Sequence, residues 1–174
     1  ACARAYGAEV VDRGVTAENR EEVARALQEE TGYALIHPFD DPLVIAGQGT
    51  AGLELLAQAG RMGVFPEAVL APVGGGGLLA GLATAVKALS PTTLHLGVEP
   101  EVADDARRSL EAGRLFRLEA PPRTRADGVR TLSLGEHTFP ILKEKADGIL
   151  VVSEEAILEA ERLLFTRTKQ LVEP

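Results

Sequence analysis

Residues 74–77 are four consecutive glycines, and they separate an apolar run at residues 68–71 from a second one at residues 78–89. Glycine lets the backbone adopt a positive φ and come close to a ligand. Successive unpaired amides before the N-terminus of a helix form a cradle for an anion. We therefore predict that this loop holds a phosphate group of a cofactor or a substrate.

The glycine run has alternative interpretations. It lacks the lysine and the following Ser or Thr of a Walker loop, which argues against a nucleotide triphosphate. A tight turn between a strand and a helix would explain some glycines, but four in a row exceed what packing needs. A dinucleotide site is a further alternative, because Gly75, Gly77 and Ala80 fit its fingerprint and Glu99 follows about 20 residues later.

The elements that position this loop alternate between strands and helices. Apolar runs predict five strands, at residues 8–11, 34–36, 68–71, 93–98 and 148–152. Helical patterns lie between them, at residues 42–59, 78–89, 104–112 and 139–145, with one before residue 32 and one after residue 153. The sequence therefore predicts an α/β fold with a mostly parallel sheet and helices on both faces.

Several residues are typical of helix ends. Thr16 is expected to be the N-cap of the first helix, which ends near Gly32. Pro42 suits a first helical turn, and one of the two aspartates before it can cap the free amides. Ser153 is expected to cap the last helix.

The composition narrows the class of protein. The 174 residues are 45% hydrophobic and 25% charged, which is ordinary for a globular protein. A net charge of -8 argues against nucleic acid as a partner. No apolar stretch approaches the roughly 20 residues of a membrane span. Cys2 is the single cysteine, so no internal disulfide forms, and we expect a cytoplasmic protein.

The two ends of the sequence suggest an internal piece of a longer protein. There is no initiator Met, and the chain stops at Pro174 just where a turn should begin. We therefore expect that catalytic groups can lie outside these residues.

Several segments of the chain resemble, in order, those of one enzyme family. The most specific is residues 37–50, with the sequence HPFDDPLVIAGQGT, and residues 72–81 form the second. Shorter ones are residues 97–101, 126–129, 138–142 and 172–174. They are similar to segments of threonine dehydratases and serine racemases, which are pyridoxal-phosphate enzymes of the tryptophan synthase β-like fold (fold type II). By that resemblance, residues 1–174 are part of the larger, cofactor-binding domain, incomplete at both ends, and residues 1–50 include the junction to a smaller domain.

The resemblance implies a set of cofactor-binding residues: Gly74, Gly75, Gly76, Gly77, Leu78, Gly128 and Glu173. The glycine loop would bind the phosphate of pyridoxal phosphate through backbone amides. Gly128 would lie beside the pyridine ring, and Glu173 near the far edge of that ring. From the residues alone, Gly128 could equally be a loop glycine, and Glu173 a solvated acid at a helix end.

The resemblance also implies a cation site. In related racemases and dehydratases, the acids and the backbone carbonyl that correspond to Glu99, Ala103 and Asp105 bind a divalent cation. Mg²⁺ and Ca²⁺ prefer such oxygen ligands. The alternative is that Asp104 and Asp105 only cap the next helix and favour its dipole.

The chain lacks the lysine that such an enzyme needs. In the family, a lysine in a Ser-x-Lys-x-Arg pattern holds the cofactor as a Schiff base and moves protons. None of the four lysines, Lys87, Lys143, Lys145 and Lys169, lies in that pattern. We therefore expect the Schiff-base lysine outside this chain, no catalytic residue within it, and no activity from this piece alone.

The resemblance implies dehydration and deamination of L-threonine or L-serine to a 2-oxo acid and ammonia. A serine racemase is the close alternative, and a dehydrogenase that uses the dinucleotide fingerprint is a distant one. A non-catalytic regulatory or interaction domain is a further possibility for the chain as given. The expected partners are an amino-acid substrate and further copies of the protein in a homodimer or homotetramer.

Overall fold

A computed structural model describes residues 2–16 and 19–174 of the chain. The chain divides into two compact units, Ala1–Ile36 and His37–Pro174. The glycine loop belongs to the second unit, which contains the whole sheet.

The first unit contains the helices α1 (Cys2–Ala5) and α2 (Arg20–Thr31). The prediction of α2 is confirmed, and Gly32 ends it in the left-handed conformation, with φ +70°. Asn19 takes the N-cap position instead of Thr16. The Thr16 amide donates to Asn19 Oδ1 at 2.6 Å, so Thr16 supports the cap rather than forming it.

Residues 8–11 and 34–36 are not strands, which corrects two of the five predicted strands. The apolar side chains Val10, Val11, Leu35 and Ile36 are all exposed. A strand needs a neighbouring strand to pair its amides and carbonyls. A hydrophobic pattern within one segment does not show whether a neighbouring strand is present. In the described part of the unit, both segments are irregular backbone.

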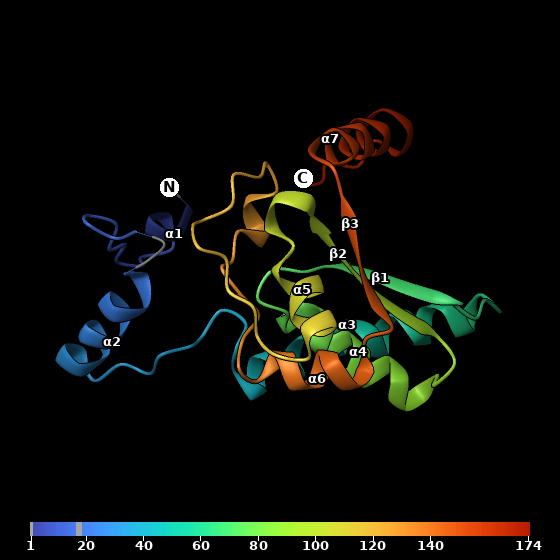
Figure 1. The fold of residues 1–174 in the computed structure, drawn as a ribbon, viewed down its shortest axis with the longest axis horizontal. Helices are drawn as coiled ribbons and strands as arrows, with labels where there is room; N and C mark the ends of the chain where they lie inside the picture. The colour runs from blue at the N-terminus through green and yellow to red at the C-terminus, as the bar shows by residue number, and fades with distance from the viewer. Residues whose placement is uncertain (1, 17–18) are drawn as a thin grey trace. The chain divides into compact units, whose positions relative to one another are not determined.

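The second unit is built on a parallel sheet of three strands, β1 (Ala68–Pro72), β2 (Leu94–Pro100) and β3 (Gly148–Val152). The strands follow the order β1-β2-β3, and β2 pairs with both of its neighbours (Figure 1). The three strands predicted in this region and their parallel arrangement are confirmed. Since all three run the same way, their carboxyl ends meet at one edge of the sheet.

The helices of this unit are α3 (Pro42–Arg61), α4 (Gly77–Leu89), α5 (Asp105–Ala112), α6 (Thr138–Lys145) and α7 (Glu154–Leu163), with the short elements η1 (Glu101–Ala103), η2 (Asp127–Val129) and η3 (Leu164–Thr168). Asp41 caps α3, because its Oδ1 accepts the amides of Leu43 and Val44 at 2.8 and 3.0 Å. Ser153 caps α7 as expected and accepts the amide of Ala156.

The core lies between one face of the sheet and helices α3, α4, α5 and α6 (Figure 1). Its buried residues include Ala71, Val73, Leu79 and Leu142. The three glycines at residues 47, 49 and 52 do not interrupt α3; Gly49 and Gly52 are buried where α3 packs against α4.

The opposite face of the sheet is more open than the sequence suggests. Leu70, Leu94 and Leu150 are about half exposed, although continuous apolar runs are typical of strands buried on both faces. Helix α7 lies near this face, where it shares a hollow with Val98 and Val152. Among the described residues, no helix combines the length and the apolar character that a membrane span requires.

Candidate functional site

The glycine loop joins β1 to α4 at the carboxyl edge of the sheet. Gly76 is the N-cap of α4 and has a φ of +92°, which favours glycine. Within residues 2–16 and 19–174, the amides of Gly74, Gly75 and Gly76 donate to no protein acceptor. The first amides of α4, from Gly77 and Leu78, have no acceptor in their own helix. The loop thus offers a row of unpaired donors, which is the chemistry that a phosphate requires.

Packing also requires glycine here, more than the sequence suggests. A Cβ at Gly75 would lie 2.2 Å from the ring of Phe39, and one at Gly77 would lie 2.9 Å from the Phe39 carbonyl oxygen. A Cβ at Gly76 would lie 2.9 Å from Leu134. Packing therefore requires glycine at these three positions, contrary to the expectation that four glycines exceed what packing needs.

Thr138 and Asp40, for which the sequence predicts no role in the loop, support it through its carbonyl oxygen and through the start of α6. The Thr138 hydroxyl donates to the carbonyl oxygen of Gly75 at 2.7 Å, and the Gly135 amide donates to the same oxygen at 3.2 Å. Asp40 accepts three amides at the start of α6, from Glu136, His137 and Thr138, at 2.9, 2.8 and 3.2 Å. Both residues lie in segments that resemble the enzyme family, residues 37–50 and 138–142, and this was the only signal in the sequence that could have pointed to them. No sequence pattern predicts a contact between residues almost 100 positions apart.

The electrostatics of Asp40 fit this role. Burial alone would raise the pKa of the Asp40 carboxyl, but the amide donors of His137, Glu136 and Thr138 together lower it below 3.8. A Cβ at Gly135 would lie 2.1 Å from Asp40 Oδ1, so only glycine lets the carboxylate reach these amides. Asp40 is thus a carboxylate held in its charged form at the N-terminus of α6.

Gly128 and Glu173 lie in different surroundings. Gly128 is exposed in η2, and the neighbouring Val129 has its Cα 3.1 Å from where a Cβ at Gly74 would be. This places the Gly128 segment beside the glycine loop. Glu173 lines a hollow of about 240 Å³ with Val98, whose partner in register, Pro72, ends β1. Both residues therefore lie toward the edge of the sheet that carries the loop.

The predicted cation ligands come together at the end of β2. Glu99 and Asp105 are almost fully buried, with 1% and 2% of their surfaces exposed, and Ala103 is buried in η1 between them. The Glu99 carboxylate accepts the amides of Ala106 and Arg107, at 3.1 and 2.9 Å, and thereby caps α5. Asp105 Oδ2 is buried with no hydrogen-bond partner.

Two buried carboxylates so close together favour either protonation or a cation. Burial raises the pKa of Glu99 to about 7, and burial together with the charge of Glu99 raises that of Asp105 to about 7. The unpaired oxygen of Asp105 fits a hard cation that prefers oxygen ligands. Among the described residues, no group of three or more His, Cys, Asp or Glu side chains is arranged to hold a metal ion, so a backbone carbonyl such as that of Ala103 would have to contribute.

The same geometry argues against a dinucleotide. In that interpretation, Glu99 would bind a ribose hydroxyl outside the end of β2. Its carboxylate is instead buried and occupied by the amides of α5.

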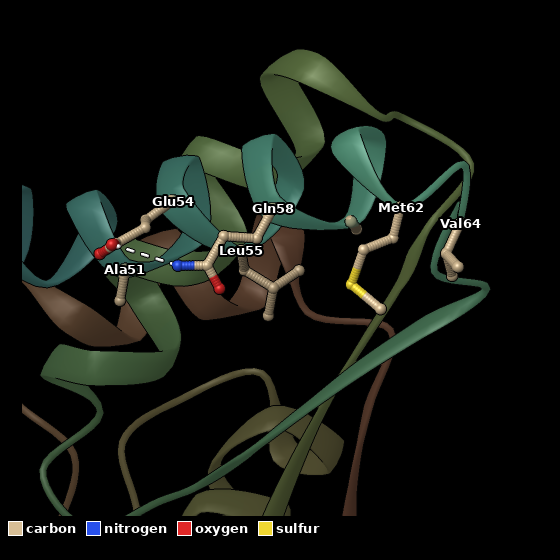
Figure 2. A pocket seen from close by; sticks show the side chains of 7 residues that line it. Ala51, Glu54, Leu55, Gln58, Met62 and Val64 are labelled. Carbon is tan, nitrogen blue, oxygen red and sulfur yellow. Dashed lines mark hydrogen bonds between the residues drawn. The ribbon is translucent and has the colours of Figure 1, made fainter.

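A larger hollow, of about 380 Å³, lies along the second half of α3 and the turn that follows it (Figure 2). Leu55, Met62 and Val64 line it together with Gln58 and Glu54, and Gln58 donates a hydrogen bond to Glu54. None of the residues predicted to bind cofactor or metal lines this hollow.

The model of the family described as pyridoxal-phosphate dependent enzymes matches residues 1–174. The chain belongs to this family. A crystal structure of a threonine deaminase from T.th. is 92% identical, with a TM-score of 0.97, over 99% of this chain and 56% of the other. The structure of maize serine racemase is 38% identical, with a TM-score of 0.91, over 98% of this chain and 52% of the other.

Curated relatives have similar names. L-threo-3-hydroxyaspartate ammonia-lyase from Pseudomonas sp is 44% identical over all of this chain and 53% of its own length. Serine racemase from Homo sapiens is also 44% identical, over 98% of this chain and 49% of its own length. The chain thus spans about half the length of the curated relatives that it matches.

Membership of the pyridoxal-phosphate family confirms the expected cofactor class and the tryptophan synthase β-like fold. The unpaired amides of the glycine loop fit the phosphate of this cofactor. The four lysines have contacts elsewhere: Lys87 pairs with Asp147, Lys143 donates to the Gly113 carbonyl, Lys145 pairs with Glu144, and Lys169 donates to the Thr166 carbonyl.

Proposed function

We propose that the protein containing this chain dehydrates and deaminates L-threonine or L-serine to a 2-oxo acid and ammonia, with pyridoxal phosphate as its cofactor. The observation that carries this proposal is the row of unpaired amides at Gly74, Gly75 and Gly76 in a chain of this family. The names of the relatives, a threonine deaminase and an ammonia-lyase, support the substrate class.

Within this chain, Gly74, Gly75, Gly76, Gly77 and Leu78 bind the phosphate through their amides. Gly128 would hold the cofactor beside its pyridine ring, and Glu173 would do so near the far edge of that ring. When bound, pyridoxal phosphate supplies an electron sink for the loss of the α-proton of the amino acid. The Schiff-base lysine comes from outside this chain, whose part is to anchor and orient the cofactor.

We also propose that Glu99, Ala103 and Asp105 hold Mg²⁺ or Ca²⁺. The support is the unpaired buried oxygen of Asp105 beside a second buried carboxylate. The cation would neutralise both carboxylates and fix the start of α5. We further propose a cytoplasmic homodimer or homotetramer that contains this chain as part of its larger, cofactor-binding domain.

The test is an activity assay of the purified protein that contains this chain, loaded with pyridoxal phosphate, with L-threonine and with L-serine as substrates. Release of a 2-oxo acid and ammonia from L-threonine or L-serine is the expected result. Serine racemase is the second candidate, favoured by the 44% identity to the human protein of that name. Formation of D-serine without release of a 2-oxo acid would replace the first proposal with the second, and neither product would contradict both.

A further inference from the structure

We propose that Thr138 is a positioning residue for the phosphate loop, and that its hydroxyl turns the peptide between Gly75 and Gly76 so that the Gly76 amide faces the anion. The inference rests on the proposed role of the loop in phosphate binding. It assigns the orientation of one donor in the cradle to a side chain at the start of α6.

The geometry of the peptide group links the two residues. In a trans peptide, the carbonyl of one residue and the amide of the next point in opposite directions. The Gly75 carbonyl is held on one side by Thr138 and by the Gly135 amide. The Gly76 amide must then point to the other side, where the described part of the protein offers it no acceptor.

The hydroxyl of Thr138 has little freedom to do anything else. Thr138 is fully buried, and its Oγ1 accepts the Gly135 amide at 2.9 Å. Its one hydrogen is therefore left to donate, and the Gly75 oxygen at 2.7 Å is nearer than the Gly135 oxygen at 3.3 Å. Asp40 fixes the backbone of Thr138 by accepting its amide.

The position of Gly76 is consistent with this arrangement. A Cβ at Gly76 would lie 3.0 Å from Thr138 Oγ1, so the hydroxyl reaches the loop only because no side chain stands there. Its φ of +92° is a conformation that other residues rarely adopt. The lack of a side chain at Gly76 and the Thr138 hydroxyl thus together fix the orientation of the peptide between Gly75 and Gly76.

Another buried threonine offers a matched control. Thr93 is 1% exposed, and its hydroxyl donates to the Pro66 carbonyl at 2.9 Å, next to β2 at the edge of the sheet opposite the loop. The variants Thr138→Val and Thr93→Val each remove one buried hydroxyl that donates to a backbone carbonyl. We expect them to lower the melting temperature by similar amounts, but only Thr138→Val should disturb the loop.

The experiment measures the affinity of the apoprotein for inorganic phosphate and for pyridoxal phosphate by calorimetry. Thr138→Val should weaken both affinities about tenfold, because one hydrogen-bond donor, the Gly76 amide, would no longer face the anion. Thr138→Ser retains the hydroxyl and should restore them, and Thr93→Val should leave them unchanged. Unchanged affinity in Thr138→Val, an equal loss in Thr93→Val, or failure of the serine variant to restore binding would overturn the inference. Absence of lyase activity in a wild-type protein that binds both anions would contradict the proposed function alone.

Discussion

The contact between Gly75 and Phe39 can be tested by a pair of substitutions. In Gly75→Ala, the new Cβ would lie 2.2 Å from two carbons of the Phe39 ring. Carbon atoms normally pack about 3.5–4.0 Å apart, so the ring would have to move by about 1.5 Å. Overpacking of this kind costs about 1–3 kcal/mol, and the closeness of the contact places Gly75→Ala near about 3 kcal/mol.

Truncation of the ring should relieve most of that cost. Phe39→Ala alone should lower the free energy of unfolding by about 2 kcal/mol, less than for a fully buried phenylalanine, because Phe39 is only half-buried. In that background, Gly75→Ala should cost less than about 1 kcal/mol, since all three close contacts are with ring atoms. The coupling between the two positions is then about 2 kcal/mol.

Gly77 provides the matched control. A Cβ at Gly77 would meet the carbonyl oxygen, Cα and Cβ of Phe39, at 2.9, 3.0 and 3.0 Å, and all of these atoms remain in Phe39→Ala. Gly77→Ala should therefore cost the same in both backgrounds.

The assay is urea unfolding of the apoprotein for the wild type, the three single variants and the two double variants. Titration with inorganic phosphate adds a second measurement, because Gly75→Ala with Phe39→Ala retains every backbone amide and should still bind the anion. If Phe39→Ala left the cost of Gly75→Ala unchanged, or relieved Gly77→Ala equally, the packing argument would be refuted.

Three further predictions follow from the charged groups. Millimolar Mg²⁺ or Ca²⁺ should raise the melting temperature of the wild type. At a cation concentration of about a hundred times the Kd of the site, the free energy of unfolding should rise by about 2.7 kcal/mol. Glu99→Gln and Asp105→Asn should abolish that shift in differential scanning fluorimetry, and equal shifts in these variants would argue against the site. Because the pKa of Asp40 lies below 3.8 in the folded state, its contribution is complete above pH 3.8 and is lost as the pH falls through the lowered value. Asp40→Asn should therefore flatten the acid limb of stability against pH in urea unfolding, and an unchanged limb would contradict this. Burial lowers the pKa of His95 below 6.5, so this group favours the folded state less as the pH falls below 6.5. Glu99 and Asp105, whose pKa values are raised to about 7, act in the opposite direction. The stability of His95→Leu relative to the wild type should therefore increase as the pH falls below 6.5, and a difference that does not change with pH would contradict this.

The prediction of elements from the sequence was accurate where the pattern was local. The three strands at residues 68–72, 94–100 and 148–152 and the helices around them were predicted almost to their bounds. The cap at Ser153, and a cap by one of the two aspartates before Pro42, were predicted because a cap depends on residues within one turn. The N-cap predicted at Thr16 was wrong, since Asn19 takes that position. Residues 8–11 and 34–36 have the composition of strands and failed as strands, because pairing depends on a neighbour that the segment does not contain.

The candidate site divides in the same way. Its cofactor loop could be proposed from the residues themselves, because Gly74–Gly77 is a short continuous segment. The cation ligands Glu99, Ala103 and Asp105 could be proposed only through the resemblance to related enzymes. The residues that hold the loop could not be found in this way. Asp40 contacts the start of α6 across 96 to 98 residues, and Thr138 contacts Gly75 across 63 residues.

By itself, then, the sequence determined a glycine loop between a strand and a helix, for which it predicts anion binding, and a resemblance to pyridoxal-phosphate enzymes that the family comparison confirmed. The tertiary structure alone decided why those glycines are required, since Phe39 and Leu134 fill the space where their side chains would be. It also decided that Glu99 is buried against α5. The physical reason is that backbone conformation and helix caps depend on neighbours in the chain, whereas steric exclusion and desolvation depend on residues that only folding brings together.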